Sequence, residues 1–199
     1  MVHFRSSPRE PGDEHLAPVS YLPGAAPAAV PAAGTAAATK AGTRAANVSL
    51  HQLARRGMSR FELSQVLAKR GVEADVAVAE LDRLESVGLL DDAALAVTLV
   101  FTQHTRKGLG RAAIAQELKR RHIDPEIIAD AVSEIADEDE EQRAVELACK
   151  RVPQLSSVDD QTAQRRLSGF LARKGYSSQV IRHAVAQALA TRDHGVRFR

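Results

Sequence analysis

Residues 59–72 read SRFELSQVLAKRGV, and related stretches occur twice more, as GRAAIAQELKRRHI at residues 110–123 and AQRRLSGFLARKGY at residues 163–176. Each copy carries large apolar residues four positions apart, the spacing that places side chains on one face of a helix. The second apolar position is held in turn by Leu67, Leu118 and Leu171. Because the copies follow one another at about fifty residues with helical spacing inside each, the sequence predicts a tandem helical repeat. Such repeats stack into an extended surface.

Start and stop signals around the first copy predict three helices in each unit. We expect a short helix from near Asn47 and a second helix that begins at the capping box of Ser59 and Glu62. A left-handed cap at Gly71 should end the second helix, and a third should run on until Gly88. The later copies have comparable signals, so the expected fold class is all-α, with three three-helix repeats forming an elongated, curved array.

The second and third units begin at acidic residues, which favour helix N-termini. Either Asp91 or Asp92 could cap the first helix of the second unit, and the acidic run 137–141 leads the third. The predicted organisation is a disordered Ala/Pro-rich extension over 1–46, repeats over 47–90, 91–136 and 137–190, and a basic tail over 191–199.

The N-terminal extension is dominated by alanine, proline and glycine. Its prolines interrupt the helix that its alanines would otherwise form, and it has too few large apolar residues to offset chain entropy. We therefore expect residues 1–46 to be disordered. The segment could be a tether, or the start codon could lie too far upstream, and the sequence leaves both readings open.

Composition narrows the class of protein. The chain has 199 residues, 44% hydrophobic and 4% aromatic, so aliphatic side chains must build its core. The single cysteine, Cys149, cannot form an internal disulfide, which fits a reducing compartment. No stretch is long and apolar enough to cross a bilayer, and the first residues lack a signal-peptide pattern. The expectation is a cytoplasmic protein, without membrane association, and a monomer.

The distribution of basic residues is more informative than the net charge of +2. Arginine far outnumbers lysine, and its planar fork suits phosphate and carboxylate partners. Bases recur at the ends of the middle helices, where they also match the helix dipole, which accounts for roughly half of them. The candidate partner- and DNA-binding residues are Arg60, Lys69, Arg70, Arg106, Lys107, Arg111, Lys119, Arg120, Arg121, Arg165, Arg166, Arg173 and Lys174.

The aromatic residues limit the kind of nucleic-acid contact. Phe61, Phe101, Phe170 and Tyr176 all fall at core spacing, whereas single-strand binders normally supply exposed stacking aromatics. Any DNA contact should therefore be dominated by phosphates and weakly sequence-specific. Arg197 and Arg199 of the tail are expected to add to it.

Catalysis, metal binding and cofactor binding have little support. The histidines lack metal-ligand spacing, and His104 on an apolar helix face favours a core or rim position. The glycines at 108 and 110 mimic a dinucleotide fingerprint, but residues 102–107 separate them from the apolar run, so the phosphate-binding geometry is lost. We expect no catalytic residue, no metal and no cofactor.

One set of residues resembles a known family. The stretch GLLDD at 88–92 with Ala96, followed by Gly108 and the segment of Leu118, is similar to the RecX family of recombinase regulators. The resemblance covers about residues 47–190. The chain departs from the family pattern at His122, where a glycine is usual, and at Leu95, where an aromatic is common.

The resemblance implies three tandem three-helix repeats and a regulator of homologous recombination and DNA repair. Members of the family bind the RecA recombinase, free and as a filament on single-stranded DNA, and inhibit filament extension, ATPase and strand exchange. It therefore implies RecA and single-stranded, possibly also double-stranded, DNA as partners, and no catalytic activity.

A winged helix-turn-helix transcription regulator is the alternative function. The residues that end the first unit, 88–90, resemble the approach to a wing. A wing is a β-hairpin, however, and Asp91 and Asp92 open another helix instead.

Overall fold

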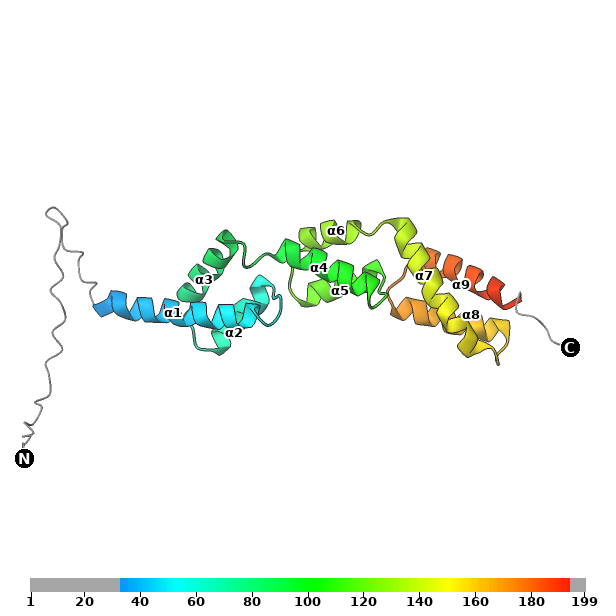
Figure 1. The fold of residues 1–199 in the computed structure, drawn as a ribbon, viewed down its shortest axis with the longest axis horizontal. Coiled ribbons are helices and arrows are strands. Elements are labelled where there is room, and N and C mark those ends of the chain that lie inside the picture. The colour runs from blue at the N-terminus through cyan, green and yellow to red at the C-terminus, as the bar shows by residue number, and fades with distance from the viewer. Residues whose placement is uncertain (1–32, 194–199) are drawn as a thin grey trace, which may run out of the picture.

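The computed structural model describes residues 33–193, and these form an elongated row of helices (Figure 1). The first repeat holds α1 (Ala33–Leu53), α2 (Arg60–Lys69) and α3 (Ala74–Ser86). The second holds α4 (Asp92–Thr105), α5 (Arg111–Arg120) and α6 (Pro125–Ser133). The third holds α7 (Asp137–Arg151), a short 3-10 turn (Val152–Leu155), α8 (Asp160–Arg173) and α9 (Ser178–Asp193). No strand occurs within 33–193, which confirms the all-α prediction.

Each repeat has its own apolar core, built around the recurring pair of the middle helix. The pairs are Leu63 and Leu67 in α2, Ile114 and Leu118 in α5, and Leu167 and Leu171 in α8, and all six side chains are fully buried. Three separate clusters of buried residues surround them, one in each repeat. The spacing of four residues thus identified the inward face of every middle helix.

The helix ends follow the predicted caps. Ser59 and Glu62 form the capping box at the start of α2. Asp91, not Asp92, caps α4 by accepting a hydrogen bond from the backbone N–H of Ala94 at 2.9 Å. His122 adopts a positive φ of 55° after α5, so this residue takes the left-handed conformation that a glycine would otherwise supply.

The first helix is longer than predicted, because α1 begins at Ala33 rather than near Asn47. The last proline of the extension is Pro31, and the residues that follow are rich in alanine, the best helix former. Ala45 is fully buried in the first core, and a guanidinium N–H of Arg44 donates to the backbone carbonyl of Arg70 at 2.6 Å. The remaining extension, 1–32, and the tail, 194–199, lie outside the described residues.

Truncation distinguishes the two parts of the extension. A chain starting at Val48 loses Ala45 from the core and the bond from Arg44, which together stabilise by about 2 kcal/mol. We expect its melting temperature to fall by about 4–8 °C, since 1 kcal/mol corresponds to about 2–4 °C in a domain of this size. A chain starting at Ala33 should have the same melting temperature as the full-length protein. Equal melting of all three would show that α1 adds nothing before Val48.

Candidate nucleic-acid interface

The predicted basic residues divide into two groups in the structure. Arg60, Arg111 and Arg121 are partly buried and hold ion pairs with carboxylates. Arg60 pairs with Asp82 and Glu85 of its own repeat. The pairs of Arg111 with Asp137 and of Arg121 with Glu62 join one repeat to the next. Lys174 likewise spans a junction through its side chain. The exposed group comprises Lys69, Arg70, Arg106, Lys107, Lys119, Arg120, Arg165, Arg166 and Arg173. Of these, Arg120 pairs with Glu117 on its own helix.

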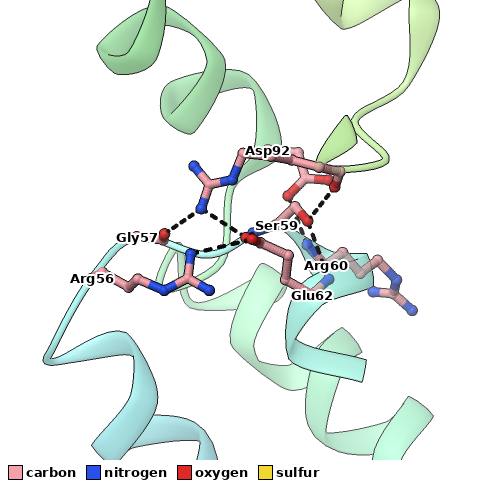
Figure 2. Close-up of polar contacts among 7 residues, drawn as sticks. Arg56, Gly57, Ser59, Arg60, Glu62 and Asp92 are labelled. Atoms are coloured by element: carbon pink, nitrogen blue, oxygen red, sulfur yellow. Dashed lines mark hydrogen bonds and ion pairs between the residues drawn. The ribbon is translucent and has the colours of Figure 1, made fainter. Parts of the chain in front are cut away.

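At the junction of the first and second repeats, the start of α2 meets the end of α5 (Figure 2). The hydroxyl of Ser59 donates to the backbone carbonyl of Arg121 at 2.6 Å. The Arg121 guanidinium donates to the carbonyl of Gly57 at 2.9 Å and to Glu62 at 2.7 Å. The backbone N–H of Arg60 donates to Asp92 at 2.8 Å.

The second and third repeats meet in a junction of the same design. The backbone N–H of Gly110 donates to the carbonyl of Lys174 at 2.8 Å, and that of Arg111 donates to Glu140 at 2.9 Å. The ammonium of Lys174 donates to the carbonyl of Lys107 at 2.7 Å. Arg60 and Arg111 therefore hold equivalent positions, and so do Arg121 and Lys174. Bases recur at these helix ends partly because the junctions use them.

Glu62 is the central acceptor of the first junction. Burial raises its pKa, but hydrogen bonds from Arg121, the Ser59 backbone and Arg56 outweigh that effect and hold the pKa below the usual range. Such a carboxylate contributes stability that is present above its ordinary pKa and is lost as the pH falls through the lower, folded-state pKa. The junction is therefore expected to weaken in acid.

Replacing Glu62 by glutamine tests this contribution. At neutral pH we expect a loss of about 1–2 kcal/mol in the free energy of unfolding, because charged hydrogen bonds to Arg121 and Arg56 are weakened. The gap between variant and wild type should close as the pH falls from the ordinary carboxyl pKa through the lower, folded-state pKa of Glu62. Asp92 at the same junction is present in both proteins, so its titration cancels in the difference between them. Burial also raises the pKa of Asp92, the opposite direction to Glu62. The matched control, Glu117→Gln, breaks an exposed pair within one helix and should cost no more than about 0.5 kcal/mol.

The exposed bases gather most densely on the third repeat. A hollow of about 350 Å³ lies between the end of α7 and one face of α8, and its guanidinium groups come from Arg151, Arg165, Arg166 and Arg173. None of the described residues that line it is acidic. Arg151 stands over the Phe170 ring at 5.2 Å from its centroid, within cation–π range, so the ring holds this guanidinium at the hollow. Several forked cations without a carboxylate form a surface suited to phosphate.

Sequence reasoning identified three of these arginines and missed Arg151 and the role of Phe170. Arg151 ends α7, outside the repeated segment, so the alignment of the copies does not mark it. Its position in the last turn of a helix is the one available signal, and dipole matching explains such a residue equally well.

The prediction that all four aromatics are core residues is wrong for two of them. Tyr176 is buried and Phe170 is partly buried, but Phe61 is 40% exposed and stacks on His122, and Phe101 is 63% exposed. Helical spacing places a side chain on a face of its helix. It does not say whether another helix reaches far enough to cover that face.

Residues 33–193 contain neither a candidate metal site nor a candidate membrane span. No cluster of His, Cys, Asp and Glu there could hold a metal ion. His104 is half-buried, with Nδ1 3.1 Å from the carbonyl oxygen of Leu109, which fits the predicted rim position. None of the helices in this range is long and apolar enough to span a bilayer.

Fold and site together define a tandem three-helix-repeat protein with a cationic hollow on its last repeat. Family models for the first, second and third three-helix domains of RecX match residues 45–84, 91–132 and 138–185. The chain therefore belongs to the RecX family of regulatory proteins, and the predicted family is confirmed.

Relatives and solved structures agree with this assignment. The chain is 45% identical over 124 residues to the regulatory protein RecX of Amycolatopsis mediterranei, covering 62% of this chain and 71% of that protein. It is 36% identical over 142 residues to that of Streptomyces coelicolor, covering 71% and 76%. The crystal structure of RecX from Lactobacillus salivarius shares the fold with a TM-score of 0.72 at 22% identity, covering 76% of this chain and 99% of that one.

Proposed function

We propose that this chain regulates homologous recombination and DNA repair by binding RecA, both free and as a filament on single-stranded DNA. Bound to the filament, it inhibits filament extension, ATP hydrolysis and strand exchange. It acts as a monomer in the cytoplasm and has no catalytic activity of its own. The observation that carries the proposal is the cationic hollow of the third repeat, set in an elongated array of a family of regulatory proteins.

The array supports binding along a filament. Its repeats are joined by polar junctions of the same design, so the three units can present their surfaces as one extended body. The arginines of the hollow supply phosphate contacts, with contributions from the exposed bases of the first two repeats. The described residues have no exposed aromatic ladder, so the contact with DNA is dominated by charge and has little sequence preference.

The ATPase of preformed RecA filaments on single-stranded DNA tests the proposal. Adding the chain should lower the steady rate of ATP hydrolysis, and the chain should sediment with the filaments. Co-sedimentation with an unchanged rate would contradict inhibition while keeping the partner. Failure to sediment with RecA, with or without DNA, would contradict the partner itself.

The winged helix-turn-helix alternative lacks its defining element. Asp91 caps α4, which follows directly where a hairpin would have to begin, and no strand occurs within 33–193. Such a regulator would bind one duplex sequence tightly and leave RecA untouched. Binding of random duplexes with equal affinity would argue further against it.

A further inference from the structure

An apolar groove runs between α4 and α6 of the second repeat, which lie side by side (Figure 1). It has a volume of about 530 Å³. Val100, Ala131 and Ile135 line it as buried residues, while Val97 and Phe101 are 52% and 63% exposed. Large apolar side chains that are exposed together in one groove form a surface that water solvates poorly.

The third repeat shows what is missing from this groove. Asp92 of α4 and Glu140 of α7 accept the equivalent backbone bonds from Arg60 and Arg111, which aligns the two helices. Val97 and Phe101 then correspond to Val145 and Cys149, which are partly buried against the third core.

The difference lies in the length of the third helix of each repeat. In the third repeat, α9 has 16 residues and packs along α7. In the second, α6 has only 9 residues and ends before it could cover Phe101. The uncovered surface is therefore the space that about two further turns of helix would fill, since a turn takes about 3.6 residues.

The charge at the edge of the groove selects among possible occupants. Asp130 of α6, Glu134 just after α6 and Asp139 of α7 line it, and no arginine or lysine does. None of these three carboxylates forms an ion pair with another described residue. An acidic edge repels the phosphates of DNA and attracts lysine and arginine.

We propose that this groove binds an amphipathic helix of the recombinase, with bulky apolar residues on one face and lysine or arginine beside them. The inference rests on the proposed function, because it takes RecA as the partner. In this arrangement the second repeat contacts RecA, and the cationic hollow of the third repeat contacts DNA. The bound helix would bury Val97 and Phe101 as the third core partly buries their counterparts, in the helix-in-groove mode of recognition.

Glutamate at Val97 tests the apolar wall against a closely matched control. Val78 on α3 is 51% exposed and lies outside the groove, so Val97→Glu and Val78→Glu make the same change at equal exposure. We expect Val97→Glu to weaken binding to free RecA by about tenfold or more. Val78→Glu should bind RecA as the wild type does. Both variants should bind single-stranded DNA normally and keep the helical content and melting temperature of the wild type.

Charge reversal tests the acidic edge. Glu134→Lys places a cation in the groove, and Glu138→Lys makes the same change at an exposed residue outside its lining. The first should weaken RecA binding and reduce its dependence on salt, and the second should do neither. Glu134→Lys also keeps the test valid if Val97→Glu fails to fold. Glu134 is an exposed residue at the end of α6, so its replacement should not disturb the fold.

The outcomes separate this inference from the proposed function. If the wild type binds RecA, and Val97→Glu and Glu134→Lys bind equally well, the groove assignment is overturned and the function stands. If the wild type does not bind RecA, the proposed function falls and the assignment with it. If the wild type self-associates in sedimentation and Val97→Glu makes it monomeric, the groove belongs to a second copy and the assignment is again overturned.

Discussion

Replacing Gly175 by alanine is expected to cost about 2–5 kcal/mol in the free energy of unfolding. Gly175 has a φ of +85°, where a side chain costs about 1–2 kcal/mol. A Cβ there would lie 2.4 Å from the backbone nitrogen of Ala113 on α5, so the second and third repeats would have to move apart. Forcing such an overlap adds about 1–3 kcal/mol. Urea unfolding followed by circular dichroism would measure the loss.

Gly71 provides the control for this substitution. Its φ is +70°, but no atom lies within 4 Å of the Cβ that alanine would add. Gly71→Ala should therefore show only the cost of the left-handed conformation, about 1–2 kcal/mol. The difference between the two variants measures the close contact at the junction. Equal losses would mean that the repeats can shift apart freely and that the junction is not rigid.

Replacing Arg151, Arg165, Arg166 and Arg173 by glutamine should cause the largest loss of DNA binding. In the proposed function each of these arginines neutralises one phosphate. Each lost contact lowers the slope of log affinity against log salt on single strands by about 0.7, so four should lower it by about 2.8. At 0.1 M salt this corresponds to an affinity lower by about 10²–10³-fold. Fluorescence anisotropy with a labelled oligonucleotide across a salt series would measure both quantities.

A second set of four bases distinguishes the effect of the hollow on DNA binding from the effect of total charge. Replacing Lys69, Arg70, Arg106 and Lys107 by glutamine removes the same charge from exposed positions of the first two repeats. Its effect on DNA affinity should be distinctly smaller, because these residues are not gathered at one hollow. Both sets should unfold like the wild type, since the bases are exposed and surface charges contribute little to stability. Equal losses from the two sets would show that DNA binding follows net charge and not the hollow.

The helices of this chain could be predicted because each depends on residues near in sequence. The pairs of leucine and isoleucine four residues apart mark the inward faces, and Ser59 with Glu62 marks a start. The exception is residues 33–46, the first two thirds of α1, because the prolines up to Pro31 and the alanines after them share one Ala/Pro-rich composition. The alanines past Pro31 form a helix because no proline interrupts them.

The candidate site was less predictable because it depends on distant residues. The sequence shows that Arg60 and Arg111 are basic, but not that carboxylates of neighbouring helices already engage them. The sequence places Phe101 on an apolar face. It does not show that α6 ends too early to cover that face. Arg151 reaches the hollow only through the packing of α7 against α8. Charge and spacing alone do not reveal these relations.

The bond from Arg44 to the carbonyl of Arg70 sets a limit on how the array could grow. The corresponding carbonyls of Arg121 and Lys174 accept bonds from Ser59 and Gly110 of the preceding repeat. Within residues 33–193 no repeat precedes the first, and α1 of the same repeat fills the place with its own arginine. A further repeat joined ahead of the first by the same contacts would have to displace Arg44. Arg44 thus occupies the carbonyl on which a preceding repeat would dock, and an Arg44→Ala variant would leave that carbonyl of Arg70 open.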